Sequence, residues 1–359
     1  MRRTAALIVG GGPAGAAAAI TLAQGGTRAL LLERHRVMPD SLCGGFLSWR
    51  SIRTLASLGI EADALNPNRV TRLRLFGGGR VRDVALPAPA VGVSRARLDR
   101  LLLDRAEAAG VAVQRGVTVR GIDARTATLA DGTEIESDTL FLASGKHDVR
   151  GSARPAPRAA DPALGLRVRL PAHPTLDRLV GDAIELHPFR GGYAGIVRQE
   201  DGSANICMAL RRSRLREAGG DPAALLLRLA AEHPHLGDRI ALGTAPPADA
   251  VANVPYGWRA LATRPGVFRV GDQAGVIPSL AGEGMGIALA TGRSAAEAWI
   301  IGGPVAAEEW QRHTARRLRR PLAIAGLLRD IAETRAAALL PWMPETLIRL
   351  SANGTRFTP

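Results

Sequence analysis

The stretch Leu7-Ile8-Val9-Gly10-Gly11-Gly12-Pro13-Ala14-Gly15 decides the fold. An apolar strand runs into a tight glycine turn, and the small residues Ala16–Ala19 begin a helix at once. Such a turn lets a pyrophosphate approach the backbone, and the helix N-terminus offers it free N–H groups and a positive dipole end. A second apolar strand ends at Glu33, about 20 residues further on, where a ribose hydroxyl needs an acceptor. This context predicts an adenine dinucleotide site. A tight packing turn without a ligand is the weaker alternative.

Composition places the chain among globular proteins with a large core. Its length of 359 residues suggests two domains. Hydrophobic residues make up 46%, which is typical of a globular chain rather than a disordered one. The net charge of +14 comes almost entirely from scattered arginines, since Lys146 is the only lysine. Aromatic residues are 4%, too few for a surface that stacks bases, so nucleic acid is not an expected partner. Attraction of anionic cofactors, substrates or lipid headgroups stays open.

Cysteine usage and hydropathy indicate the compartment. The two cysteines, Cys43 and Cys207, form neither a disulfide framework nor a metal-ligand spacing. We therefore expect no metal and a reducing, cytoplasmic environment. No segment has the roughly 18 apolar residues of a spanning helix. The membrane contact considered below is therefore peripheral, at the inner face. The sequence leaves the oligomeric state open.

Turn residues divide the rest of the chain into short elements. A helix from Arg95 to Ala109 begins at the N-cap Ser94 and ends at Gly110. Antiparallel strands and two long helices follow a Pro-rich crossover over 155–162. The strands are expected over 164–170, 183–187, 194–198 and 205–210, and the helices over 284–301 and 306–340. The chain is thus expected to form part of a dinucleotide-binding sheet, then an antiparallel sheet, and finally the rest of the dinucleotide-binding domain.

Four segments, in this order, carry a resemblance to a known family. They are Gly10–Gly15 with Glu33, Arg95-x-x-Leu98-Asp99, Ala143–Arg150, and Gly271-Asp272-x-Ala274-x-x-x-Pro278 continuing into Gly282–Met285. Together they resemble FAD-dependent oxidoreductases with the fold of para-hydroxybenzoate hydroxylase. That family includes aromatic monooxygenases and geranylgeranyl reductases. The resemblance implies FAD as cofactor and NAD(P)H as its reductant.

The predicted fold class is α/β, or α+β overall. A Rossmann-like FAD-binding domain, discontinuous in sequence, carries an inserted antiparallel-sheet substrate domain and C-terminal helices. The FAD-binding domain is assigned to residues 1–70, 91–160 and 261–303. The substrate domain is assigned to residues 71–90 and 161–260, and the C-terminal helical segment to residues 304–359.

The segment after residue 270 is predicted to bind the flavin on physical grounds that do not depend on the resemblance. Gly271 and Asp272 end a buried strand, where a carboxylate can accept hydrogen bonds from the ribityl hydroxyls of a flavin. A glycine-rich loop then opens a helix, whose N–H groups can face the pyrimidine edge of the flavin. An ordinary strand–loop–helix connection is the weaker alternative. The full set of predicted cofactor-binding residues is Gly10, Gly12, Pro13, Ala14, Gly15, Glu33, Arg34, Cys43, Gly44, Arg95, Val119, Ser144, Gly145, Gly271, Asp272, Pro278, Gly282, Gly284 and Met285.

The resemblance bears on two of these positions, Arg95 and Ser144. Arg95 lies at the start of a helix, where a cation is favourable only with an anion nearby. The resemblance implies that this arginine contacts the FAD backbone. A solvated arginine in the first helical turn is the alternative. Ser144 departs from the family, because the hydroxylases have Asp there. Lys146 and Arg150 of the same segment could bind a phosphate.

Three residues are candidates for catalysis, and others for lining the substrate cavity. Cys43-Gly44-Gly45 resembles the Cys-Gly-Gly of geranylgeranyl reductases, so Cys43 is either a proton donor or a small apolar liner. His187 is a candidate general base, with a structural histidine as the more common alternative. Tyr193 is the third candidate. Phe46, Trp49 and Tyr193 are the predicted substrate-contacting residues, and each fits a core position as well.

The leading functional hypothesis is an NAD(P)H-dependent monooxygenase that hydroxylates an aromatic or polyketide-like apolar substrate. One alternative is an ene reductase of the geranylgeranyl reductase type, acting on an isoprenoid. Another is a flavin electron-transfer or binding protein. The apolar stripe of residues 322–331 and the cluster 339–343 predict a lid over the substrate cavity. A sharper hypothesis adds weak, salt-sensitive contact with an anionic membrane.

Overall fold

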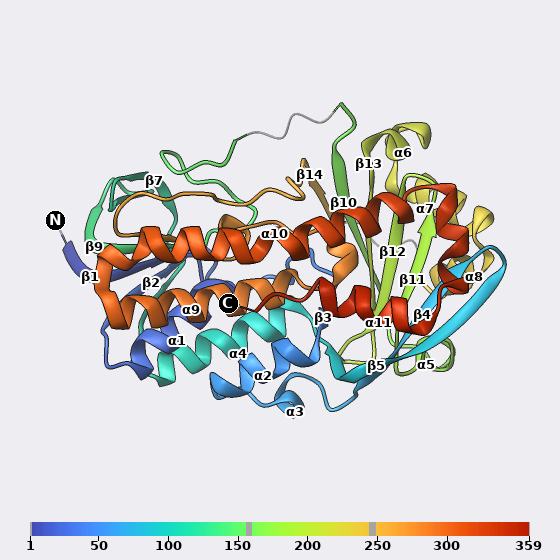
Figure 1. Cartoon of the computed structure of the whole chain (residues 1–359), viewed down its shortest axis with the longest axis horizontal. Helices are drawn as coiled ribbons and strands as arrows, with labels where there is room; N and C mark the ends of the chain where they lie inside the picture. Colours follow the sequence, from blue (N-terminus) through green and yellow to red (C-terminus); the bar gives the residue numbers. More distant parts are fainter. Residues whose placement is uncertain (1, 156–159, 244–248, 359) are drawn as a thin grey trace.

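The computed structural model describes residues 2–155, 160–243 and 249–358. Two β-sheets lie toward opposite ends of an elongated molecule, and helix α10 (Ala306–Ala332) runs along one side from the first to the second (Figure 1). The N-terminus lies at the end that holds the first sheet, and the C-terminus lies midway along the molecule (Figure 1).

The first sheet has seven strands in the order β6-β2-β1-β9-β8-β7, with β15 paired to β9. The pairs β1–β2, β1–β9, β2–β6 and β9–β15 are parallel, while β7–β8 and β8–β9 are antiparallel. Its strands are β1 (Arg2–Val9), β2 (Ala29–Glu33), β6 (Ala112–Arg115), β7 (Val119–Asp123), β8 (Thr126–Leu129), β9 (Glu134–Leu142) and β15 (Val267–Arg269). Helices cover one face and residues of β7 and β8 pack on the other. That double burial explains the continuous apolar runs of β1 and β2.

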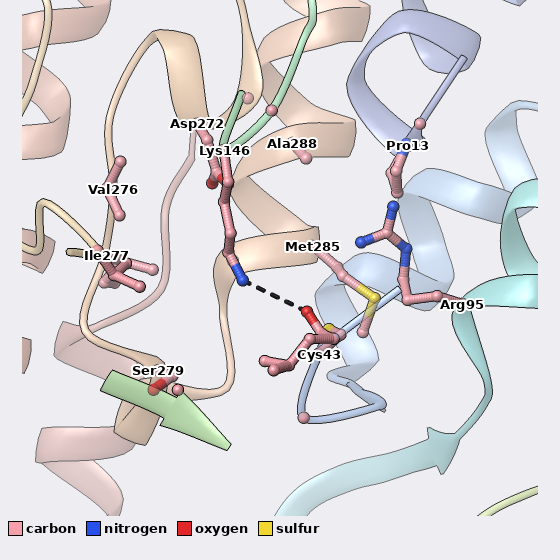
Figure 2. A pocket seen from close by; sticks show the side chains of 18 of the residues that line it. Pro13, Cys43, Arg95, Lys146, Asp272, Val276, Ile277, Ser279, Met285 and Ala288 are labelled. Atoms are coloured by element: carbon pink, nitrogen blue, oxygen red, sulfur yellow. Dashed lines mark hydrogen bonds between the residues drawn. The ribbon is translucent and has the colours of Figure 1, made fainter. Parts of the chain in front are cut away.

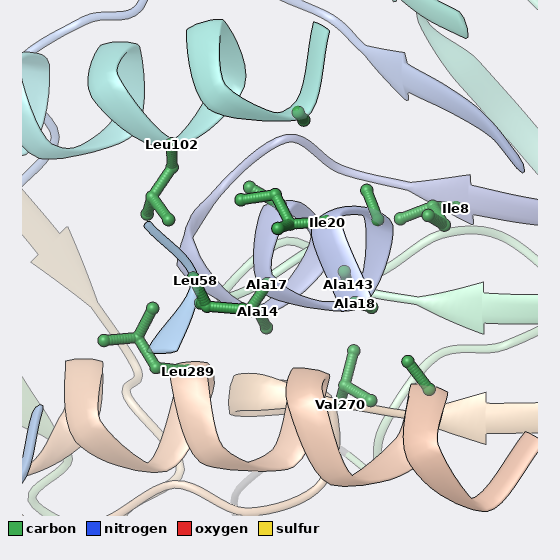
Figure 3. Close-up of a cluster of buried hydrophobic side chains, with 14 of the residues drawn as sticks. Ile8, Ala14, Ala17, Ala18, Ile20, Leu58, Leu102, Ala143, Val270 and Leu289 are labelled. Carbon is green, nitrogen blue, oxygen red and sulfur yellow. The ribbon is translucent and has the colours of Figure 1, made fainter. Parts of the chain in front are cut away.

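Helix α1 (Pro13–Gln24) packs at very short range on α9 (Gly284–Gly302), because both present small residues. A Cβ on Gly292 would lie only 2.0 Å from the carbonyl oxygen of Ala14. Leu289 fills the space beside this contact (Figure 3). This close contact sets the N-terminal end of α1 against the middle of α9. Nearby lie α2 (Trp49–Ser57), α3 (Ala62–Leu65) and α4 (Arg95–Ala108).

The second sheet has eight strands in the order β14-β10-β13-β12-β11-β4-β5-β3. All neighbours are antiparallel except β4 and β11, which are parallel. Its strands are β3 (Phe46–Leu47), β4 (Val70–Gly77), β5 (Arg80–Gly92), β10 (Ala163–Leu170), β11 (Ala183–Phe189), β12 (Gly192–Arg198), β13 (Ala204–Arg211) and β14 (Asp249–Ala252).

Different elements cover the two faces of this sheet. One face packs on α5, α7 and α8 through Leu176, Leu225 and Leu236. The other face, which includes Leu75 and Val84, packs on the C-terminal segment. The short helices here are α5 (Pro174–Val180), α6 (Arg212–Glu217), α7 (Pro222–Glu232), α8 (Pro234–Ile240) and α11 (Glu345–Gly354). The 3-10 turns are η1 (Gly271–Gln273), η2 (Ser279–Ala281), η3 (Gly303–Val305) and η4 (Arg335–Trp342).

The predicted fold class is confirmed, and the prediction for the C-terminus is corrected. The helix expected over 306–340 is wrong in length, because α10 ends at Ala332. Thr334 is extended there and its hydroxyl accepts a hydrogen bond from the N–H of Ala336, which starts the separate turn η4. The crossover expected over 155–162 lies partly outside the described residues, since 156–159 are not described. The domain boundaries stay a prediction.

Candidate functional site

A cavity of about 180 Å³ lies where the glycine turn, the start of α9 and the second sheet meet (Figure 2). Segments far apart in sequence line it, and each contributes a few residues. They include Gly12–Ala14, Leu42–Phe46, Arg95, Gly145 and Lys146, Gly165, Cys207 and Met208, Tyr256, Val270–Asp272, Ser279, Gly282, Gly284 and Met285.

The glycines of the turn have two distinct roles. Gly10 has φ +107°, and a Cβ on it would lie 2.5 Å from the carbonyl oxygen of Ala143. A Cβ on Gly15 would lie 1.9 Å from the carbonyl oxygen of Gly10. These two glycines are therefore required by packing. A Cβ on Gly12 would meet only the guanidinium of Arg95, at 3.4 Å, so Gly12 leaves room on the cavity side.

Glu33 closes the turn from the neighbouring strand. Its Oε2 accepts a hydrogen bond from the N–H of Gly11 at 2.7 Å, and its Oε1 accepts one from the N–H of His35 at 2.8 Å. The carboxylate is buried. His35 Nδ1 also lies 2.7 Å from Oε1. The carboxylate is therefore an acceptor at the tip of β2, and Oε2 is the oxygen that keeps a lone pair for a further donor.

Arg95 is fixed over the glycine turn by its own helix. Its Nε and Nη2 donate to the carboxylate of Asp99, one helical turn on, at 3.0 and 2.7 Å. Burial opposes the charge, but this ion pair raises the pKa of Arg95 above its ordinary value. The guanidinium extends toward Pro13 (Figure 2). A permanent cation thus faces the N-terminus of α1, where the phosphates of a dinucleotide would lie.

The loop that contains Cys43 is held in place by two side chains. The amide nitrogen of Asn205 donates to the carbonyl oxygens of Cys43 and Gly44, both at 2.9 Å. Lys146 Nζ donates to the carbonyl oxygen of Leu42 at 3.3 Å (Figure 2). The Cys43 side chain lies at the cavity next to Met285 (Figure 2).

The glycine loop before α9 is tied to the C-terminus. Glu283 is buried and forms an ion pair with the buried Arg356, whose Nη1 also donates to the carbonyl oxygen of Ala281 at 3.0 Å. The Arg356 guanidinium carbon lies 5.0 Å from the ring centroid of Trp49. Burial raises the pKa of Glu283, and Arg356 acts against that rise. The loop therefore depends on a residue almost at the end of the chain.

A second cavity, of about 130 Å³, adjoins the first. Phe46 and Gly282 line both. Apolar side chains from β4, β5 and β11 form one wall, and α10, η4 and α11 form the other. Its apolar lining includes Leu73, Leu75, Leu86, Ile184, Leu186, Leu280, Leu328, Leu340, Met343 and Ile348.

Comparison with known proteins agrees with this geometry. The FAD binding domain family matches residues 3–150. Menaquinone reductase of Mycobacterium tuberculosis (strain H37Rv) is 30% identical over 312 residues, covering 81% of this chain and 75% of that protein. The chain belongs to this family of FAD-dependent oxidoreductases. Digeranylgeranylglycerophospholipid reductase 2 of Methanopyrus kandleri is 27% identical over 327 residues, covering 84% of this chain and 76% of that protein.

A solved structure extends the likeness to the monooxygenases at the level of fold. P. aeruginosa PqsL in complex with 2-aminobenzoylacetate has a TM-score of 0.77 at 17% identity, covering 95% of this chain and 100% of that chain. This oxidoreductase therefore has an FAD-binding, monooxygenase-like fold and relatives among the reductases. It is an enzyme that uses FAD, with NAD(P)H as the reductant usual in its family.

The residues around the first cavity fit FAD. Gly12 leaves open the space that a side chain would fill, Arg95 supplies a cation beside it, and the N-terminal end of α1 supplies N–H groups. Asp272 lines the cavity at the end that faces α9. Gly282 has φ +61° and lets the chain turn into α9, whose first residues, Gly284 and Met285, line the cavity.

The structure brings most of the predicted cofactor residues to this cavity. Those that line it are Gly12, Pro13, Ala14, Cys43, Gly44, Arg95, Gly145, Gly271, Asp272, Gly282, Gly284 and Met285, together with the predicted substrate residue Phe46. Gly10, Gly15, Glu33, Ser144 and Pro278 lie directly behind or beside lining residues. Arg34 and Val119 do not line it: Arg34 is exposed and hydrogen-bonds His147 Nε2 at 2.8 Å, and Val119 packs with the β7–β8 cluster.

Of the three remaining candidates, two line neither cavity and the third, Tyr193, lies at a cavity as expected. His187 lines neither cavity: it stacks on Phe76 with ring centroids 4.0 Å apart and its Nε2 pairs with Glu185. Burial lowers the pKa of His187, so its surroundings favour the structural interpretation. Trp49 is covered by Arg356 and lines neither cavity. Tyr193 lines the second cavity.

Sequence reasoning missed several residues that line the cavities. Tyr256 and Cys207 lie outside the four motif segments, and Ser279 directly follows the predicted Pro278. Burial raises the pKa of Cys207 to about 12, so it stays a thiol. Only the two-residue alternation of strand β13 could have indicated that Cys207 faces the same way as Asn205.

We predict that Asp272→Ala weakens FAD binding by about 1–3 kcal/mol, because hydroxyls of the bound cofactor would lose their acceptor. Flavin retained against serial dilution measures the effect, with exposed Asp104→Ala as the control. Unchanged affinity for FAD in a folded Asp272→Ala variant would show that Asp272 does not contribute to cofactor binding.

Proposed function

We propose that this enzyme uses reduced FAD to saturate a carbon–carbon double bond in an isoprenoid-like apolar chain. The observation that carries the proposal is the apolar second cavity, which adjoins the flavin-binding cavity at Phe46 and Gly282. A substrate tail lying there would hold a double bond at the junction, next to the cofactor. The relatives named menaquinone reductase and digeranylgeranylglycerophospholipid reductase support this reaction class.

The chemistry divides between cofactor and protein. FAD, once reduced by NAD(P)H, supplies the hydride that one alkene carbon takes up. The protein must bring a proton to the other carbon and exclude water. Cys43 is half-buried at the flavin cavity, and we assign its thiol as the proton donor. Phe46 would hold the alkene at the junction.

Hydroxylation of an aromatic or polyketide-like substrate is the second candidate function. Its support is the monooxygenase-like fold and a group of hydroxyls, contributed by Tyr193, Tyr256 and Ser279, that could orient a phenol. The two reactions differ in what they add to the substrate. Reduction adds two hydrogens and needs no oxygen, whereas hydroxylation adds one oxygen atom and consumes O₂.

The deciding experiment incubates holoenzyme, NAD(P)H and a prenylated naphthoquinone with and without oxygen, and identifies products by mass spectrometry. We expect a gain of two hydrogens in both atmospheres that persists after any quinol is reoxidised to the quinone, and that fragmentation places in the prenyl tail. A product carrying one extra oxygen, formed only in air, would show that the enzyme hydroxylates its substrate and would contradict the proposed reduction. Reoxidation of the flavin with neither product would favour an electron-transfer protein.

Cys43→Ala is predicted to lower the rate of alkene reduction by roughly 10²–10⁴-fold, the usual contribution of a positioned proton donor. FAD content should stay unchanged, because the loop is held through backbone carbonyl groups. Single-turnover rates of Cys43→Ala and of Cys207→Ala, the matched thiol, are compared. Equal rates for Cys43→Ala and wild type would reject the thiol as donor.

We also propose that the C-terminal segment contacts an anionic membrane weakly, at its inner face. Leu340, Met343 and Ile348 of this segment line the second cavity, while Leu339, Trp342 and Leu350 are 64%, 55% and 66% exposed. Arg80 lies over the Trp342 ring, 3.5 Å from its centroid. An aromatic and apolar surface with basic residues beside it suits such a membrane. In the described residues no helix is long and apolar enough to cross a bilayer.

Sedimentation with anionic liposomes tests this contact. We expect partial co-sedimentation at low salt that falls at high salt, and its loss in a Leu339→Asp, Leu350→Asp double variant. Leu227→Asp is the control, because Leu227 is 71% exposed on α7. Protein that stays in the supernatant at both salt concentrations would leave this segment as a lid only.

A further inference from the structure

Three hydroxyl groups meet at the wall between the two cavities. Tyr193 on β12 and Tyr256 in the loop after β14 both hydrogen-bond Ser279 Oγ, Tyr256 at 3.0 Å. Ser279 and Tyr256 line the flavin cavity, and Tyr193 lines the apolar cavity. Ser279 lies on the cavity wall opposite Arg95 (Figure 2). We call these three residues the hydroxyl trio.

Counting donors leaves one proton of the trio unused. Each hydroxyl can donate one hydrogen bond and accept two. The two links within the trio use two of its three O–H donors, whichever way each link points. No other acceptor for these hydroxyls occurs among the described residues. The remaining O–H is therefore available to an acceptor in the cavity.

The surroundings of the trio suit a neutral acceptor. Ala209, Ala332 and Leu280 pack around the tyrosines. Burial raises the pKa of both tyrosines above the ordinary value, which keeps them protonated donors at neutral pH. The guanidinium carbon of Arg329 lies 6.0 Å from the Tyr256 ring centroid, and Arg329 is paired with Asp330 and Glu333. Lys146 lines the same cavity, where its Nζ donates to the carbonyl oxygen of Leu42. A phosphate group usually needs an unpaired cation or several converging donors.

We infer that the hydroxyl trio binds a neutral oxygen, a carbonyl or phenolic oxygen on a ring, of a substrate whose apolar tail occupies the second cavity. The inference rests on the proposed function for the position of the tail. It selects a quinone- or phenol-headed lipid over an isoprenoid diphosphate. The trio lies between the two cavities, so the ring would stand beside the flavin and the first part of the tail would pass Phe46.

The test measures equilibrium binding to oxidised holoenzyme, so it does not depend on turnover. Three probes are titrated in one detergent by the perturbation of the flavin spectrum. They are a naphthoquinone with a four-isoprene tail, geranylgeranyl diphosphate, and phytane, a hydrocarbon with no head group. Ser279→Ala and Tyr256→Phe should weaken the naphthoquinone roughly 3- to 10-fold, which corresponds to one neutral hydrogen bond. Binding of phytane should not change. Ser57→Ala, an exposed serine on α2, is the control.

The outcomes separate this inference from the proposed function. Equal weakening of naphthoquinone and phytane would mean that the trio only supports the cavity, and would overturn the inference. So would unchanged naphthoquinone binding, or a diphosphate that binds more tightly than the quinone and depends on the trio. Trio-dependent quinone binding without any alkene reduction would keep the inference and reject the proposed reaction.

Discussion

Gly12→Val is expected to yield a folded, colourless protein that added FAD does not turn yellow. In the structure a Cβ at this position meets only the Arg95 guanidinium, at 3.4 Å, so a Cβ fits there without a shift of the backbone. The isopropyl group would instead fill the space that a pyrophosphate needs beside the start of α1. We expect the affinity for FAD to fall at least roughly 10³-fold, about 4 kcal/mol.

Gly15→Ala is the informative comparison, because its defect should be of another kind. A Cβ there would lie 1.9 Å from the carbonyl oxygen of Gly10, so the turn itself must shift. Flavin absorbance and thermal unfolding of the apoproteins distinguish the two variants. Gly12→Val should lose flavin without losing apoprotein stability, whereas Gly15→Ala should lose both. A yellow Gly12→Val protein would place the pyrophosphate elsewhere.

The cofactor half of the site was predictable because its signals are local. The turn Gly10–Gly15, Glu33 and the Asp272 segment each combine a strand end with a glycine or carboxylate, and parallel strands bring their carboxyl ends to one edge of a sheet. Arg95 needed one further step. Its partner Asp99 is four residues away on the same helix, a spacing visible in the sequence.

The substrate half was less predictable because it depends on which face of a sheet is covered. Successive residues of β11 point to opposite faces. Leu186 and Pro188 line the apolar cavity, and His187 between them faces the buried pair of Glu185 and Arg239. The sequence identifies this alternation but not the segment that packs on each face. The segments that pack on the cavity side of the sheet are η4 and α11, which lie more than 140 residues further along the chain.

The link between the C-terminus and the flavin loop could not be predicted for a related reason. Arg356 is one of many arginines, and neither its neighbours nor its spacing distinguish it. Its importance comes from burial beside Glu283, a contact 73 residues apart in sequence. Long-range ion pairs of this kind carry no periodic signal.

Arg356→Met should destabilise the protein strongly, by about 3–5 kcal/mol at pH 7–8, because it leaves Glu283 buried and unpaired. Methionine keeps much of the side-chain volume, so loss of the charge dominates the effect. Burial already raises the pKa of Glu283, and Arg356 acts against that rise. Without Arg356 the pKa of the folded state should rise further. Urea unfolding with FAD in excess, at several pH values, measures the change.

The sign of the pH dependence makes this prediction specific. A carboxyl group whose pKa is raised by folding favours the folded state most at low pH, and this contribution is lost as the pH rises through the folded-state pKa. The stability difference between Arg356→Met and wild type should therefore be largest at neutral pH. It should shrink as the pH falls toward about 4.3, the ordinary pKa of glutamate. Adding Glu283→Gln to Arg356→Met should recover much of the loss at neutral pH, because no buried charge remains. A deficit that is equal at pH 5 and pH 8, or a double variant no better than the single one, would mean that Arg356 acts by packing on Trp49 rather than by its charge.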